Sequence, residues 1–140
     1  ERAILLGLPS LRTSVIIAQP YTGGGGEMDS GPILGLSPEV PIDFMGETLD
    51  GLRELAASRP EKRPVGGFKD ALEAVAKHNQ ERLKVGGDWV VFPPVVADFA
   101  AGRFGLDDDE RLLYQVDGAW EPVKTVVYGD GEPQPMRLDD

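Results

Sequence analysis

One histidine, His78, and no cysteine occur among the 140 residues. A thiol nucleophile, a disulfide framework and a zinc site with two or more His or Cys ligands are therefore excluded. His78 is followed by Asn79, whose amide needs hydrogen-bond partners if it is buried. Because imidazole titrates near neutral pH, this pair is the candidate ligand-binding site. The alternative is structural: a loop backbone satisfies Asn79, and His78 lies half exposed at a helix border.

Two further groups of residues are candidates for partner binding. Gly24 and Gly25 belong to a run of four glycines, 23–26, that lacks the dinucleotide and P-loop patterns and precedes acidic residues. We interpret this run as a flexible loop, or alternatively as a lid or an arm that orders against a partner. Tyr114 and Trp120 are the other interaction candidates, and packing of both rings in the core is the alternative.

Four contiguous acidic residues, 107–110, suggest a cation site because hard cations choose carboxylate oxygens. Contiguous side chains diverge, however, and the alternating spacing and central glycine of a calcium loop are missing. We instead expect Asp107 to cap a helical turn, with Glu110 as its capping-box partner. The sequence therefore predicts no metal site, and it indicates no cofactor.

The elements that position these residues are short, because 18 glycines and 12 prolines imply many turns. Apolar spacings of three and four predict a helix over 47–58 and a stronger helix over 68–84. The stronger helix is expected to end at Gly86 and Gly87. It carries His78 on the flank of its apolar stripe.

Short apolar runs indicate the remaining elements of the first two thirds of the chain. Residues 3–6 and 13–18 predict two strands, or one strand and one short helix. Residues 88–92 predict a strand. Two prolines then open a brief helix over 95–101.

The last third of the chain predicts a hairpin. Runs rich in β-branched and aromatic residues, 111–116 and 119–128, flank Asp117 and Gly118, which tolerate the left-handed backbone of a two-residue turn. Pro122 has no N–H for a strand ladder, so the second strand is expected at a sheet edge or bulge. The predicted register pairs Val116 with Ala119, Gln115 with Trp120, Tyr114 with Glu121 and Leu113 with Pro122.

These elements predict a single α+β domain over residues 1–140. Its sheet is small and mostly antiparallel, contains the C-terminal hairpin and is packed by two main helices. A long Gly/Pro-rich loop is expected over 19–41, and a loose acidic tail over 129–140.

The net charge of −10 disfavours a nucleic-acid partner and an anionic membrane surface. Residues 107–140 hold ten acidic and three basic residues, so most of the charge lies in that quarter. Apolar runs fall short of the roughly 20 residues that cross a bilayer. We expect a soluble protein, with the cytoplasm favoured.

No motif in the sequence points to a reaction. We therefore expect a non-enzymatic binding or assembly protein, such as an accessory subunit, an immunity-type inhibitor or a structural component. It would act through a protein partner or a homo-oligomer. The alternative is a small enzyme or ligand-binding domain whose polar pocket gathers His78 and Asn79.

Overall fold

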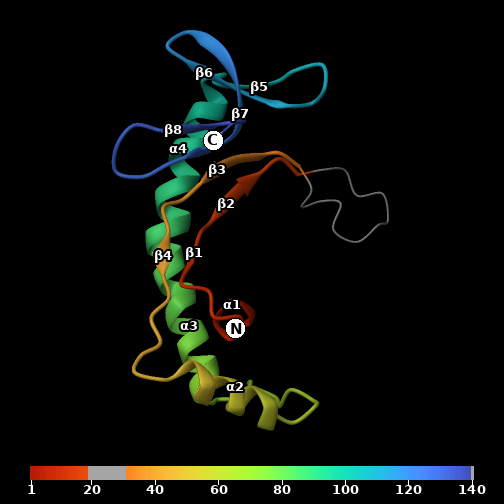
Figure 1. Cartoon of the computed structure of the whole chain (residues 1–140), viewed down its shortest axis with the longest axis vertical. Helices are drawn as coiled ribbons and strands as arrows, with labels where there is room; N and C mark the ends of the chain where they lie inside the picture. Colours follow the sequence, from red (N-terminus) through yellow and green to blue (C-terminus); the bar gives the residue numbers. More distant parts are fainter. Residues whose placement is uncertain (19–30, 140) are drawn as a thin grey trace.

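A column of helix forms the long axis of the molecule, with a sheet at one end and two smaller helices at the other (Figure 1). The computed structural model describes residues 1–18 and 31–139. Its helical elements are α1 (Arg2–Leu5), α2 (Leu49–Ser58), α3 (Ala71–Leu83), the π-helical turn η2 (Lys84–Asp88) and α4 (Trp89–Ala100). Its strands are β1 (Ser10–Leu11), β2 (Ser14–Ile16), β3 (Ile33–Leu36), β4 (Val40–Pro41), β5 (Phe104–Leu106), β6 (Leu112–Val116), β7 (Ala119–Val127) and β8 (Gln134–Arg137).

The predicted α+β class and the mostly antiparallel sheet are confirmed. The larger sheet has six strands in the order β2-β3-β7-β6-β5, with β8 also paired to β7. β3 and β7 are parallel, and its other neighbouring strands are antiparallel. β1 and β4 form a separate antiparallel pair beside the helical column. Of the two readings of the first apolar runs, one short helix and one strand is the one observed.

The hairpin forms at the predicted turn and in the predicted register. Asp117 and Gly118 both have a left-handed backbone, with φ of 50° and 82°, as a two-residue hairpin turn requires. Of the two expectations for the second strand at Pro122, the edge is not observed, because β7 lies between β3 and β6. The other is observed next to Pro122, where the register of β7 with β8 shifts between Val123 and Thr125, as at a bulge. Pro122 instead marks a change of partner: it pairs with Leu113 of β6, and Val123 begins the pairing with β8.

Two segments expected to be irregular contain strands. Within the predicted loop over 19–41, β3 and β4 form beyond residue 31, and β3 pairs with both β2 and β7. Gly35 of β3 permits close packing there, since a Cβ on it would lie 2.4 Å from Val95 Cγ2 and 3.0 Å from the Tyr128 ring. The expected loose tail over 129–140 is also wrong, because β8 adds to β7 and half buries Pro135 and Met136.

The predicted helix over 68–84 does not stop at its two glycines. It begins at Ala71, with Asp70 as its N-cap, and continues through η2 into α4. Gly86 and Gly87 do not end the helix. They allow neighbouring segments to pack closely against it. A Cβ on Gly87 would lie 2.5 Å from Thr13 Oγ1, and one on Gly86 would lie 3.2 Å from Val40 Cγ2.

The predicted strand over 88–92 is therefore wrong, because these residues form η2 and the first turns of α4. Local β propensity is overridden by tertiary packing, in which Val91 and Val95 lie one helical turn apart and are both buried. The predicted end of the helix near 101 is confirmed, with Gly102 following in a left-handed conformation at φ 75°.

The core falls into two clusters along the column. The sheet packs on α4, and the members of that cluster are Leu34, Val91, Val95, Leu112, Tyr114, Val123, Val126 and Tyr128. The predicted helices α2 and α3 pack instead with α1, and the members of that cluster are Ile4, Leu52, Leu72 and Val75. The helix that covers the sheet is therefore α4. The sequence had predicted a strand (88–92) and a short helix (95–101) in its place.

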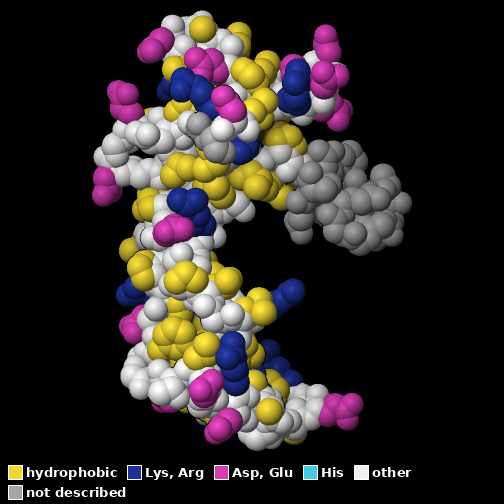
Figure 2. Space-filling model, in the orientation of Figure 1, with side chains coloured by type: hydrophobic (Ala, Val, Ile, Leu, Met, Phe, Trp, Pro, Cys, Tyr) yellow, Lys and Arg dark blue, Asp and Glu magenta, His cyan; other side chains and the backbone are white. Residues whose placement is uncertain are grey.

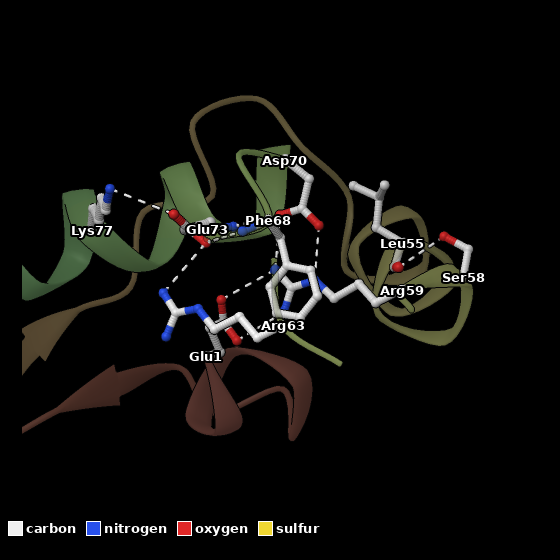
Figure 3. Close-up of polar contacts among 9 residues, drawn as sticks. All are labelled: Glu1, Leu55, Ser58, Arg59, Arg63, Phe68, Asp70, Glu73 and Lys77. Carbon is white, nitrogen blue, oxygen red and sulfur yellow. Dashed lines mark hydrogen bonds and ion pairs between the residues drawn. The ribbon is translucent and has the colours of Figure 1, made fainter. Parts of the chain in front are cut away.

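An ionic network joins the three helices at the end opposite the sheet (Figure 3). Arg59, after α2, donates from Nε and Nη2 to the two carboxylate oxygens of Asp70, both at 2.8 Å, and from Nη1 to Glu1 at 2.9 Å. Its guanidinium carbon lies 4.1 Å from the centre of the Phe68 ring. Asp70 Oδ1 also accepts from the backbone N–H of Glu73, which caps α3.

We expect Gly35→Ala to destabilise the protein by about 1–3 kcal/mol, because the added methyl collides with Val95 and Tyr128 in a filled core. Gly131→Ala is the matched control, since a Cβ there meets no atom within 4 Å. Urea denaturation of both variants measures the difference. Equal stability of the two variants would contradict the close packing of β3 on α4.

We also expect stability to fall as the pH is lowered from about 4 toward 2. The Arg59 hydrogen bonds lower the pKa of Asp70 from its ordinary value of 3.8 to about 2. A carboxyl whose pKa is lower in the folded state stabilises the fold above its ordinary pKa and ceases to do so as it is protonated. Thermal melts between pH 2 and pH 7 should show this loss.

The isosteric variant Asp70→Asn keeps a helix-capping oxygen but removes the charge. It should cost about 1–2 kcal/mol at pH 7 and flatten the acid branch of the stability profile. Asp50→Asn, which changes an exposed carboxylate in the first turn of α2, is the control and should leave that branch intact. An unchanged profile in Asp70→Asn would show that this ion pair does not stabilise the fold.

Candidate functional site

Five large apolar residues form a line along the outer side of η2 and α4. They are Val85, Trp89, Phe92, Val96 and Phe99, and each is between 47% and 61% exposed. Their spacing is four, three, four and three, which places them along one side of a helix. We call this line the apolar stripe. Contiguous exposed apolar surface of this kind marks an interaction site in soluble proteins.

The packed side of α4, which adjoins the stripe, fixes which residues point outward. Val91 and Val95 are at most 1% exposed and pack beneath the sheet. Farther along the helix, Asp98 Oδ2 accepts hydrogen bonds from the hydroxyls of Tyr114 and Tyr128, each at 2.7 Å. These contacts tie α4 to β6 and to the residue after β7, so the rotation of the helix is set from inside the fold.

Asp98 lies in a polar cluster that is largely buried on the Asp98 side and partly exposed at Arg103. Arg103 Nη1 lies 3.3 Å from Asp98 Oδ1, and the guanidinium carbon lies 4.9 Å from the centre of the Tyr114 ring. Burial and the hydrogen bond to Asp98 raise the pKa of Tyr114 to about 12, and the same causes raise the pKa of Tyr128. Both tyrosine hydroxyls therefore stay protonated at neutral pH and donate to Asp98. These hydrogen bonds connect α4 to the sheet.

No charged residue of α4 itself lies on its outer side, although Lys84 of η2 places its Nζ 5.7 Å from the centre of the Trp89 ring. Among residues 89–102 the sole charged side chain is Asp98, and it is directed at the two tyrosines. A helix that is apolar on all sides is normally covered on all sides. Within the described part of the chain, no helix is both long and apolar enough to span a bilayer. The apolar stripe thus has the composition of an interface and lies on the surface.

A cavity of about 500 Å³ opens beside the stripe, between β2 and the first turns of α4. Its walls include Val15 and Ile16 from β2, and Trp89, Phe92 and Pro93 from α4. β2 is an end strand of the six-stranded path, so the cavity lies at a margin of the sheet. Its volume accommodates an apolar side chain from a partner.

Both residues of the predicted polar pair, His78 and Asn79, form hydrogen bonds with one residue, Asp43. His78 Nε2 lies 2.8 Å from Asp43 Oδ2, at the exposed surface. Asn79 Oδ1 accepts from the Asp43 backbone N–H at 2.8 Å, and its Nδ2 donates to the carbonyl oxygens of Asp43 and Val75. Both amide hydrogens are used, so Asn79 holds the loop before α2 on α3. This is the structural alternative for Asn79, and ligand binding by His78 stays a prediction.

The aromatic candidates on the hairpin separate to opposite faces of the sheet. Tyr114 is 1% exposed and belongs to the core, whereas Trp120 is 49% exposed. Trp120 pairs with Gln115 across the hairpin and lies over Gly105 of β5, where a Cβ would meet its ring at 3.4 Å. Gly24 and Gly25 lie outside the described residues.

The acidic run 107–110 forms a tight turn between β5 and β6 and not a helical turn. Asp107 Oδ1 accepts from the backbone N–H groups of Asp109 and Arg111, and Glu110 has a left-handed backbone at φ 62°. Arg111 Nε binds Asp107 Oδ2 at 2.7 Å. In the described part of the chain, no group of three or more His, Cys, Asp or Glu side chains has an arrangement that could hold a metal ion.

No family model, curated protein or solved structure matches this chain. The functional argument therefore depends on the geometry of the apolar stripe.

Sequence reasoning missed the stripe because Gly86 and Gly87 and the two prolines divided it among separate predicted elements. The signal was nevertheless present. The 4-3-4-3 spacing from Val85 to Phe99 runs unbroken across all four residues. Testing that period across the glycines would have predicted one continuous helix.

We expect Asn79→Ala to cost about 1–3 kcal/mol of unfolding free energy, because it leaves the backbone groups of Asp43 without their partners. His78→Gln, next to it on the same helix, should change stability by less than about 0.5 kcal/mol because its hydrogen bond to Asp43 is exposed to solvent. Urea denaturation compares the two. A larger loss in His78→Gln than in Asn79→Ala would contradict these roles.

Proposed function

We propose that this protein is a non-enzymatic binding or assembly module that contacts a protein partner through the apolar stripe on α4. The observation that carries the proposal is the uncharged outer face of a helix whose inner face is already packed against the sheet. Two phenylalanines and a tryptophan at helical spacing are not expected on a face that contacts only solvent. Aromatic residues of this kind supply most of the binding energy at protein interfaces.

The surface is preorganised for binding. The tyrosine hydrogen bonds to Asp98 fix the rotation of α4, and the buried valines fix its distance from the sheet. A partner therefore meets side chains on a rigid helix, which lowers the entropy cost of association. The cavity beside Trp89 and Phe92 offers a pocket in which an apolar side chain of the partner is enclosed.

A second candidate function is a small enzyme or ligand-binding domain at His78. The observation in its favour is the carboxylate of Asp43 at 2.8 Å from His78 Nε2, beside an opening of about 480 Å³ lined by Val40, Arg82 and Val85. A carboxylate that orients an imidazole is a common general-base arrangement. The His78→Gln variant tests this candidate: loss of a native activity with unchanged stability would support it.

Site-specific photocrosslinking tests the stripe directly. A photoreactive phenylalanine analogue at position 92 should give one discrete crosslinked product in extracts of the native source. The same analogue at position 65 should give none, because Val65 is fully exposed but lies outside the stripe. Phe99→Glu in the same chain should abolish the product, since it places a charge in the interface. Equal labelling from positions 92 and 65 would overturn the proposal.

A further inference from the structure

We infer that the partner of the apolar stripe is a second copy of this chain, bound by antiparallel pairing of two α4 helices. The inference rests on the proposed function and names its partner. Four observations support it: the spacing of the stripe, its symmetry, the distribution of charge and the area that a pair would bury.

The spacing selects a helix as the opposing surface. Apolar residues that alternate at intervals of four and three form the seam by which one helix packs its side chains between those of another. A strand would require a period of two, and a flat surface would require no period. Over 15 residues, from Val85 to Phe99, the stripe keeps this interval. The occupant is therefore expected to be a helix with a seam of the same kind.

The stripe is close to symmetric about Phe92. Val85 and Phe99 lie seven residues to either side, and Trp89 and Val96 lie three and four residues away. A twofold axis at Phe92 would thus place Phe92 against its own copy and Val85 against Phe99. A twofold interface must be complementary to itself, and this near-symmetry meets that condition.

Charge favours the antiparallel orientation over the parallel one. Residues 107–140 carry ten acidic and three basic residues, and all of β6, β7 and β8 lie among them, at the C-terminal end of α4. Acidic side chains surround this end of the molecule in Figure 2. Residues 71–88, at the other end of the helix, carry three acidic and three basic residues. Antiparallel pairing keeps the two acidic ends apart and sets each beside the balanced segment of its partner.

The buried area is sufficient for a reversible dimer. With an aromatic side chain contributing about 150–250 Å² when fully buried, the stripe offers roughly 500 Å² per copy. A symmetric pair would then bury about 1,000 Å², which is the lower limit of specific interfaces. The cavity between β2 and α4 adds a hole into which an aromatic ring of the partner can insert. We therefore expect a dimer that dissociates on dilution.

The mass of the intact chain in solution, measured by sedimentation velocity from about 1 µM to about 1 mM, is the first test. The chain should pass from monomer to dimer over this range. Phe92→Glu should raise the dissociation constant roughly a hundredfold. Val65→Glu, which places the same charge on an exposed valine outside the stripe, should leave the constant unchanged. Circular dichroism checks the fold of each variant, and Val96→Glu is a second variant if Phe92→Glu is misfolded.

Cysteine substitutions then determine the orientation, because the native chain contains no cysteine. Antiparallel pairing predicts a disulfide in the Phe92→Cys variant alone, since the twofold axis brings that position against itself. Val85→Cys and Phe99→Cys should each remain uncrosslinked and should crosslink when mixed. Efficient self-crosslinking of Val85→Cys and Phe99→Cys separately would overturn the antiparallel arrangement.

The outcomes separate this inference from the proposed function. A chain that stays monomeric at the highest concentration, while position 92 still crosslinks to a different protein, overturns the second copy and retains the binding function. A dimer that is insensitive to Phe92→Glu and Val96→Glu overturns the proposed face.

Discussion

The fold depends on the close approach of a loop at Thr13 and of strand β4 at Val40 to a helix at its glycines. Thr13 and Val40 contact η2 at distances that a side chain on Gly87 or Gly86 would prevent. Thr13 Oγ1 also donates to Asp88 Oδ1 at 2.6 Å, and the glycines keep negative φ. These contacts hold a π-helical turn where a helix would otherwise end. α3 and α4 are consequently one column, and the two core clusters lie along it.

Because α3 and α4 form one continuous column, each core cluster covers only part of its surface. The cluster at one end uses α1, α2 and α3, while the cluster at the other uses α4 and the sheet. Each cluster occupies one side of its helix. α4 is apolar on both sides, so burying one of them leaves the stripe on the surface. The unusual feature is therefore the composition of the outer side of α4, and it is the observation from which the binding role is proposed.

Polar groups inside the fold fix geometry and leave the surface free for binding. The Asp98 carboxylate accepts from two tyrosines, Asn79 satisfies the backbone of Asp43, and Asp70 joins Arg59 to the start of α3. In each case a buried or half-buried polar atom is matched by a specific partner, which removes alternative packings. The chain thus presents a rigid frame around one apolar face.

The sequence by itself determined the elements whose signals are local. The hairpin turn at Asp117 and Gly118, its register and the helix over α2 all depend on residues a few positions apart, and the structure has them as predicted. The structural alternative for Asn79 was also foreseen, although its partner, Asp43, lies 36 residues away.

Only the tertiary structure decided whether glycine and proline end an element or permit a close contact. Two adjacent glycines such as Gly86 and Gly87 look the same in the sequence whether they end a helix or allow another segment to pack against it. Here Thr13 and Val40, from elsewhere in the chain, pack against them, and the helix continues. The same reasoning applies to Gly35, which allows β3 to form in an expected loop. The 4-3-4-3 spacing over residues 85–99 is present in the sequence. Only these contacts between distant segments decide that the helix continues through the glycines and that this side of it stays exposed.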